Sequence, residues 1–466
     1  MLSENLVENF LAKRYASQEI IKIFDAREKI VLEREFWIEI LRLQIEYGLN
    51  LNEKILENYE RAKLKIDLES IAKRERKLKH DVKARIEEFN SLANADFIHL
   101  GMTSRDLTEN VELIQIRKAL NKIKKDLESI LGIFYNLINQ NIEIVLVART
   151  HNVPAQLTTL GKRFSDFAQE TLLGLNHLEF EILHLPFKGL KGAVGTQSDL
   201  LQVSGNEAIS KIEKSLADKY GFKQILDSTT QIYSRSIDSG WSHALVRAVA
   251  PLSSFATTFR LMAGFGLINE ITTGEQVGSS AMPHKNNPRT AERINGLMIV
   301  AEGFESMLKN LSGRQWNEGD VSCSVVRRIA VPNIFYAIDG LIRNCAGLMI
   351  NSQPNFENIK DEVESCLPKI LSSKIMIELT KKGMGREQSH KLIKELMSNN
   401  NFLNMADLKL ELQNNKELNF RKEEIELLDK NLLALTGNAV RQCNLILNNL
   451  KKYRNYEPSN LQLSDN

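Results

Sequence analysis

Apolar residues recur at three- and four-residue steps over long parts of the chain. One such stretch runs from Leu107 to Ile133, and residues 241–271 and 420–450 show the same spacing. This spacing places apolar side chains on one face of an α-helix. No alternating apolar and polar run, typical of a strand, competes with it. The pattern therefore predicts an all-α protein built on long helices.

The positions of the prolines favour the same fold. The 466 residues include only nine prolines. None precedes Pro154, none lies between Pro186 and Pro251, and none lies between Pro368 and Pro458. Since proline in a helix interior costs about 3 kcal/mol, these proline-free spans permit very long helices.

Two breaks rich in turn- and cap-forming residues divide the chain, at residues 94–106 and 351–356. Thr103 or Ser104 in the first break is suited to cap the long helix that follows. We predict an N-terminal helical domain (1–105), a central long-helix bundle (106–350) and a C-terminal helical domain (351–466).

Composition and charge narrow the class of protein. The hydrophobic fraction of 43% and the charged fraction of 26% are ordinary for a soluble globular protein. The formal net charge is only +2, which argues against nucleic acid as a partner. The most apolar stretch, residues 250–268, contains Arg260, so we expect a buried helix and no membrane span. The N-terminus has no apolar signal segment and the four cysteines form no paired motif, so we expect a cytoplasmic protein.

One segment, residues 274–288 (GEQVGSSAMPHKNNP), interrupts the helical pattern with two Gly, two Ser, two Pro and two Asn. A loop of this composition more often carries function than packing, although a plain surface connection is the alternative. It resembles the signature loop G-S-S-x-M-P-x-K-x-N-P of the fumarase/aspartase superfamily at every fixed position. The resemblance implies elimination of fumarate or a close relative from a succinyl compound. It also implies a homotetramer with a twenty-helix core and active sites shared between subunits.

Further segments, in the order of the family's motifs, resemble the adenylosuccinate lyase branch of that superfamily. They are Arg14-Tyr15-Ala16-Ser17, Lys79-His80-Asp81-Val82, Thr150-His151 with Pro154-Ala155-Gln156, Gly195-Thr196-Gln197, and Asp320-Val321-Ser322-Cys323-Ser324 with Arg328 beyond. This resemblance implies that adenylosuccinate and SAICAR are the substrates, with fumarate released in purine biosynthesis. The alternatives are another superfamily member, such as argininosuccinate lyase or fumarase, or a non-catalytic helical scaffold.

The resemblance also implies catalytic roles. Ser279 is the expected base, although residue chemistry alone does not separate it from its neighbour Ser280. Lys285 and Asn287 are expected to hold the carboxylate that gains charge. His151 is the expected acid, since histidine titrates near neutral pH, and Glu292 is expected to orient it. His80 is expected to assist at the phosphate or the leaving group.

A substrate with one phosphate and two carboxylates requires a locally cationic site. The candidate basic residues are Arg14, Lys79, Lys285, Arg293 and Arg328. The other expected substrate contacts are Tyr15, His80, Asp81, Thr103, Ser104, Gln156, Gln197, Asn287 and Ser324. Each of these residues is otherwise an ordinary surface or capping residue. No metal and no cofactor are implied, because the sequence has neither a metal-ligand spacing nor a nucleotide-binding loop.

One position departs from the common pattern of the branch. An arginine often precedes the segment that begins at Asp320, but here Gly319 stands there. Arg314 and Arg327 are the nearest candidates to supply that charge.

Overall fold

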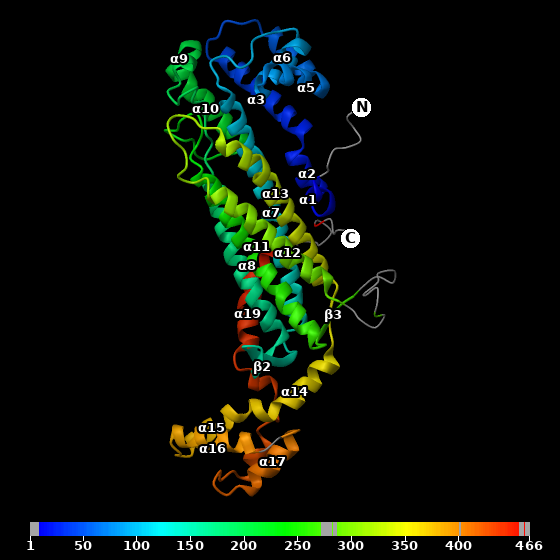
Figure 1. Cartoon of the computed structure of the whole chain (residues 1–466). Helices are drawn as coiled ribbons and strands as arrows, with labels where there is room; N and C mark the ends of the chain where they lie inside the picture. Colours follow the sequence, from blue (N-terminus) through cyan, green and yellow to red (C-terminus); the bar gives the residue numbers. More distant parts are fainter. Residues whose placement is uncertain (1–8, 272–281, 283–286, 400–401, 456–460, 462–466) are drawn as a thin grey trace.

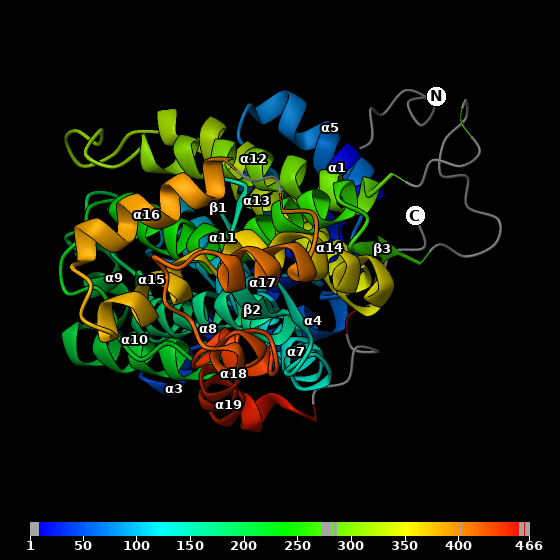
Figure 2. The same ribbon diagram turned by 90° about the horizontal axis from the view of Figure 1, so that it is seen from below.

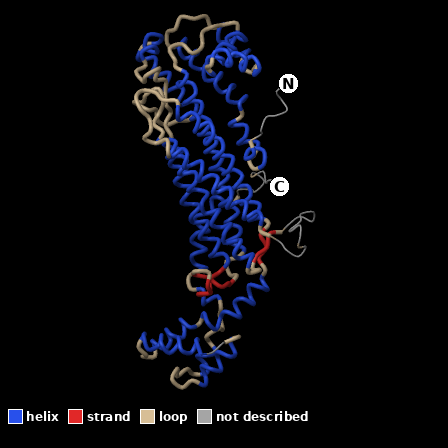
Figure 3. Tube along the Cα trace, viewed as in Figure 1, coloured by secondary structure: helices blue, strands red, loops and turns tan. Residues whose placement is uncertain are grey.

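The computed structural model describes residues 9–271, 282, 287–399, 402–455 and 461. The molecule is elongated, with a helical N-terminal region at one end, a bundle of long helices in the middle and a small helical region at the other end (Figure 1). Helix dominates and the strands are short and few (Figure 3). The predicted all-α class is confirmed.

Long helices running side by side form the central bundle (Figure 1). They are α7 (Ser104–Gln140), α8 (Leu160–His184), α11 (Ser236–Gly264), α12 (Arg289–Lys309) and α13 (Ser322–Ile350). The 37 residues of α7 give it a length of about 55 Å. Its predicted apolar positions from Leu107 to Ile133 are buried in the core that the bundle helices share. Pro251 and Pro332 lie inside α11 and α13, so these prolines do not end the helices.

The N-terminal region packs short helices around an aromatic core. Its helices are α1 (Phe10–Arg14), α2 (Gln18–Phe24), α3 (Ala26–Glu46), α4 (Lys54–Ala62), α5 (Leu68–Leu78) and α6 (Asp81–Ala93). Phe36, Trp37, Tyr59 and Phe89 are buried there. Two further helices, α9 (Ser198–Ser204) and α10 (Asn206–Tyr220), lie at the same end of the bundle (Figure 1).

Two small antiparallel sheets lie toward the opposite end. Strands β1 (Val145–Thr150) and β2 (Val153–Thr159) form a hairpin, and β3 (Ile268–Glu270) pairs with β4 (Ser352–Pro354). The apolar pattern did not predict the hairpin. Its strands are only six and seven residues long, and their exposure does not alternate regularly.

The C-terminal helices have an apolar core of their own, which Val147 and Leu157 of the hairpin join. They are α14 (Phe356–Ile370), α15 (Ser372–Lys381), α16 (Arg386–Asn399), α17 (Met405–Asn414) and α18 (Lys422–Glu426), and they lie across the end of the bundle (Figure 2). The expectation of one long helix over 420–450 is wrong. The chain instead makes α18, a turn η1 (Leu433–Thr436), α19 (Ala439–Leu450) and a last turn η2 (Lys451–Tyr453), with Gly437 at φ +61° before α19.

Helix α19 returns to the bundle and contacts α7 and α8, so the end of the chain shares the central core. The domain boundaries at 105 and 350 stay predictions. None of the helices in the described part of the chain is long and apolar enough to cross a membrane.

Candidate active site

A cleft of about 710 Å³ lies where α3, α6, α7 and α13 meet. Six of the expected substrate contacts line it, namely Lys79, His80, Asp81, Ser104, Ser324 and Arg328. They come from three segments that are far apart in the chain. The fold therefore brings together the K-H-D-V segment, the start of α7 and the start of α13.

The turn between α5 and α6 places the K-H-D-V side chains at the cleft. Lys79 ends α5 in the left-handed conformation, with φ 55°, and His80 is the N-cap of α6. The Nδ1 of His80 accepts a hydrogen bond from the backbone N–H of Lys83 at 3.2 Å. When the ring is neutral, Nε2 therefore carries the proton, and it is the atom able to donate to a ligand. The His80 side chain is about half exposed.

Asp81 connects the K-H-D-V turn to α13. Its carboxylate lies 3.2 Å from Nη2 of Arg328 and 3.5 Å from Nη2 of Arg85. Burial alone would raise the pKa of Asp81, but Arg85, the N–H of Val82 and Arg328 together lower it below its ordinary value. Asp81 is therefore an anion that holds Arg328 near the cleft mouth.

The starts of two long helices face the cleft. Thr103 is the N-cap of α7, and its N–H donates to the carboxylate of Asp106 at 3.0 Å. Ser324 lies in the first turn of α13, and Arg328 follows one turn later. Helix N-termini attract anions through their free N–H groups and the helix dipole. The arrangement suits a phosphate or carboxylate ligand.

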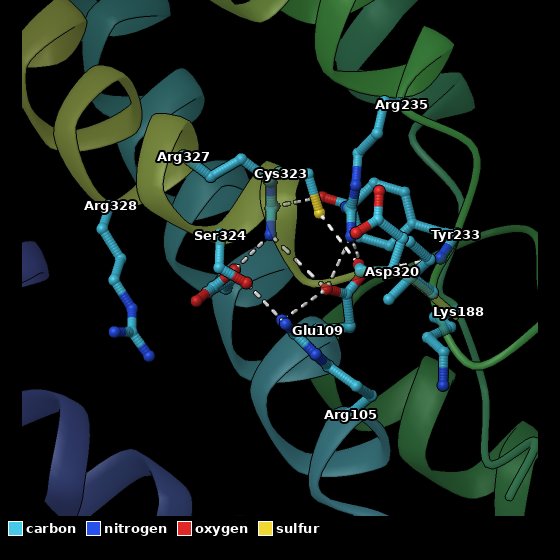
Figure 4. A network of polar contacts seen from close by, with 12 residues as sticks. Arg105, Glu109, Lys188, Tyr233, Arg235, Asp320, Cys323, Ser324, Arg327 and Arg328 are labelled. Carbon is cyan, nitrogen blue, oxygen red and sulfur yellow. Dashed lines mark hydrogen bonds and ion pairs between the residues drawn. The ribbon is translucent and has the colours of Figure 1, made fainter. Parts of the chain in front are cut away.

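A buried ion network supports this part of the cleft (Figure 4). Arg327 of α13 binds Asp238 at 2.8 Å and also bonds Glu112 and the hydroxyl of Tyr233. Burial would lower the pKa of Arg327, but Asp238 and the other anionic neighbours raise it well above its ordinary value. Arg327 is thus a permanent cation whose charge is used inside the protein, where it ties α13 to α7 and α11.

A second group of predicted residues lies toward the other end of the bundle. His151 occupies the turn of the β1–β2 hairpin with φ 51°, and both it and Gln156 are exposed. The hairpin is held by Arg149, whose guanidinium pairs with Glu362 and lies 4.1 Å from the ring centre of Phe265.

The first turn of α12 belongs to the same end of the bundle. Glu292 is exposed and lies 3.9 Å from Arg260, and Arg293 donates to Oδ1 of Asn344 at 3.0 Å. Sixteen residues separate Asn344 from Arg328 on α13, which corresponds to about 24 Å along the helix. The turn before α6, with the His80 group, and the start of α12, with the Arg293 group, therefore lie far apart within one chain (Figure 1).

Other predicted residues occupy further positions. Arg14 is exposed at the end of α1, and Tyr15 packs against Gly340 of α13 while its carbonyl accepts from Arg343 at 2.8 Å. The side-chain amide of Gln197 donates to the carbonyl of Leu190 at 2.7 Å, so that end of the side chain is used within its loop.

The signature loop is described only in part. Ser279 and Lys285, the expected base and its cationic neighbour, lie outside the described residues, as do Ser280 and most of residues 274–288. Asn287 is described and lies, partly buried, just before α12.

Comparisons with known proteins identify the family. A family model described as "Lyase" matches residues 50–303. The adenylosuccinate lyase of Schistosoma mansoni is 30% identical over 398 residues, which cover 83% of this chain and 82% of that protein. The adenylosuccinate lyase of Saccharomyces cerevisiae is 31% identical over 405 residues, with the same coverage of both chains. The chain belongs to the adenylosuccinate lyase family.

The fold of this chain matches solved structures along almost the whole length of the chain. The 3-carboxy-cis,cis-muconate lactonizing enzyme of Pseudomonas putida superposes with a TM-score of 0.83 at 18% identity, covering 96% of this chain and 100% of the other. A fumarate lyase of Mesorhizobium sp. BNC1 gives a TM-score of 0.79 at 17% identity, covering 93% and 98%. At such identities the likeness concerns the fold alone.

Sequence reasoning missed the charged residues that α7 places at the cleft and directly behind it. Arg105, Glu109 and Glu112 all belong to α7, and Glu109 is fully buried. Their signal was weak but present, because Glu109 falls within a turn of Leu107 and Val111 on a helix that is otherwise apolar at its buried positions. Among the described residues, no group of three or more His, Cys, Asp or Glu side chains is arranged to hold a metal ion.

Proposed function

We propose that this member of the adenylosuccinate lyase family cleaves adenylosuccinate to AMP and fumarate, and SAICAR to AICAR and fumarate. The observation that carries the proposal is the convergence of two of the family-like motifs, the K-H-D-V segment and the segment that begins at Asp320, with Ser104 of α7 on one cleft. Lys79, His80, Ser104, Ser324 and Arg328 all line it, although the chain separates them by up to about 250 positions.

The charge of the cleft suits a polyanionic substrate. Six lysines and arginines line it against four carboxylates, which leaves an excess of about two positive charges with His80 neutral. One of the carboxylates, Glu33, is fully buried, and burial raises its pKa despite the nearby Arg85. Protonation of Glu33 would increase the positive excess further. A phosphate and a dicarboxylate find complementary charge here.

The proposed reaction is an acid–base elimination. Ser279 removes a proton from the succinyl carbon beside one carboxylate, and the electron pair spreads into that carboxylate. Lys285 and Asn287 stabilise the resulting charge, as preorganised donors do in other enzymes. The C–N bond then breaks to leave fumarate, and His151, oriented by Glu292, protonates the departing purine nitrogen.

We further propose a cytoplasmic homotetramer in which one active site takes residues from several subunits. Support comes from the separation of the His80 group from the Arg293 group within one chain. Exposed apolar side chains on the long helices also support association, since such patches mark contact surfaces. Three of the most exposed are Leu173 on α8, Ile299 on α12 and Val325 on α13.

A spectroscopic assay tests the activity. Purified protein is mixed with adenylosuccinate and the ultraviolet absorbance is followed as AMP forms. Argininosuccinate and malate serve as control substrates. Turnover of adenylosuccinate alone is expected. Turnover of argininosuccinate or malate instead would favour another superfamily activity, and no turnover of any of them would favour a scaffold.

A further inference from the structure

The cleft contains a cation that none of the family-like motifs predicted. Arg105 extends from the first turn of α7 and lines the cleft beside Ser104. Its Nη2 donates to Oγ of Ser324, so its guanidinium reaches across from α7 to the start of α13 (Figure 4). The side chain is about 14% exposed.

The positive charge of Arg105 is only partly neutralised within the protein. Its nearest carboxylate is Glu109, 3.3 Å from Nη1. Glu109 already accepts two hydrogen bonds from Arg235, at 2.8 and 2.9 Å, and lies 3.6 Å from Arg327. One carboxylate is therefore shared by three guanidinium groups, which leaves Arg105 with charge available to a ligand in the cleft.

Arg314 and Arg327, which the sequence suggested as replacements for the arginine that is absent at position 319, are less suitable than Arg105 to bind a ligand in the cleft. Arg327 is bound by Asp238 and Glu112 and is only 3% exposed. Arg314 is not among the residues that line the cleft. A side chain at position 319 would itself meet Gln231, because a Cβ built there lies 2.9 Å from Oε1 of that residue.

We propose that Arg105 is a phosphate-binding residue of this enzyme, acting with Ser324 and Arg328. This inference rests on the proposed function. Ser324 and Arg328 are one turn apart on α13, and Arg105 faces them from α7, so a phosphate seated at Ser324 has a guanidinium on each helix. Arginine suits this role because its planar fork gives a phosphate two parallel hydrogen bonds.

The test compares Arg105→Gln, Arg105→Lys and Arg314→Gln with the wild type. Hydrogen bonds to charged groups are worth about 1.5–3 kcal/mol, so Arg105→Gln should raise the KM for adenylosuccinate roughly 10- to 100-fold, with kcat changed less than about threefold. Arg105→Lys keeps the charge but loses the fork, so its KM should be intermediate. Arg314→Gln, the matched control, should behave as wild type.

Calorimetric binding of AMP and of fumarate identifies which part of the substrate Arg105 contacts. Arg105→Gln should weaken AMP binding by the same roughly 10- to 100-fold factor and leave fumarate binding unchanged. Equal weakening of both ligands, or weakening of fumarate alone, would overturn the phosphate assignment. Unchanged AMP binding in Arg105→Gln, or a loss in Arg314→Gln instead, would overturn it too.

Two controls separate this inference from the function on which it rests. Wild-type protein that fails to cleave adenylosuccinate contradicts the proposed function, whereas an active wild type with an unaffected Arg105→Gln contradicts only the role of Arg105. The variant is expected to fold, because Arg235 still binds Glu109 when Arg105 is absent. An AMP-binding loss accompanied by unfolding in thermal melts, with Arg105→Lys no better than Arg105→Gln, would count against the proposal.

Discussion

The buried pair of Lys188 and Asp106 offers a sharp test of how the cleft is supported. Both side chains are completely buried and the Nζ–Oδ1 distance is 2.8 Å. The carboxylate of Asp106 also accepts from the backbone N–H groups of Thr103, Lys191 and Gly192, at 3.0, 2.9 and 3.0 Å. It therefore fixes the loop around Lys188 against the first turn of α7, beside the cleft.

The two partners should respond unequally to substitution. Removing one partner of a buried ion pair costs about 3–5 kcal/mol, because the other charge is left uncompensated. Lys188→Met leaves Asp106 with its three backbone donors, so we expect a cost of about 3 kcal/mol. Asp106→Asn leaves the ammonium of Lys188 buried without a counter-charge, so we expect a cost of about 5 kcal/mol.

The double variant gives the most discriminating result. Adding Lys188→Met to Asp106→Asn removes the stranded ammonium, so the second substitution should raise stability relative to Asp106→Asn alone. The matched control is Lys219→Met. Lys219 pairs with Glu39 at 2.6 Å, but its side chain is 45% exposed, and a surface pair is worth about 0–1 kcal/mol.

Urea unfolding is carried out at one fixed protein concentration, since the stability of the proposed oligomer would depend on concentration. Two-state unfolding is usual only for small single domains, and this chain has 466 residues, so the order of the unfolding midpoints is compared. Asp106→Asn should have the lowest urea midpoint, the double variant a higher one, and Lys219→Met a midpoint close to that of the wild type. The midpoint of Lys188→Met should also lie above that of Asp106→Asn. A double variant less stable than Asp106→Asn would refute the reasoning.

Three further predictions concern catalysis and pH. Ser279→Ala and His151→Ala should each lower turnover of adenylosuccinate at least about 100-fold without changing the assembly measured by light scattering, as expected of acid–base groups; near-normal turnover would remove the assignment. Mixing a variant altered at Lys79 and His80 with Ser279→Ala, after denaturation and joint refolding, should restore some activity that neither has alone; no recovery after verified subunit exchange would contradict shared sites. Burial raises the pKa of Asp126 from 3.8 to about 7, despite its bonds to Lys122. The folded chain therefore holds a proton that the unfolded chain releases, so Asp126 destabilises the fold increasingly as pH rises from about 4 to 7. Asp126→Asn should therefore reduce the fall in melting temperature between pH 5 and 8. An unchanged dependence of melting temperature on pH would contradict this role of Asp126.

Sequence predicted the long helices because their apolar positions are buried on one face. The stretch from Leu107 to Ile133 behaves in this way throughout. The prediction was wrong over 420–450, where the same periodicity is divided among short helices. Gly437 adopts a positive φ there, and the residues before and after it belong to different apolar cores. The periodicity of apolar residues indicates which face of a helix is buried. It does not indicate whether that face packs against one apolar core or is divided between two.

Motifs predicted part of the cleft lining but not the buried ion network behind it. Lys79, His80 and Ser324 lie in segments whose local pattern is distinctive. Glu109 and Arg235, by contrast, are 126 positions apart, one inside α7 and the other directly before α11. Their pairing depends on how α7 and α11 pack, so only the three-dimensional structure could join them. Arg105 was not predicted as a cleft residue for the same reason, since its hydrogen-bond partner Ser324 is 219 positions away in the sequence.

The elongated bundle limits how a complete site can form. One chain presents the K-H-D-V turn and the start of α13 at one end, and the start of α12 toward the other (Figure 1). Neighbours related by a twofold axis perpendicular to the long helices run antiparallel. The K-H-D-V turn of one chain then lies beside the start of α12 of its partner. Such packing brings the His80 group of one chain close to the Arg293 group of the other without bending either chain. Parallel neighbours would keep the two groups about 24 Å or more apart. The shared-site proposal therefore requires antiparallel association of neighbouring chains.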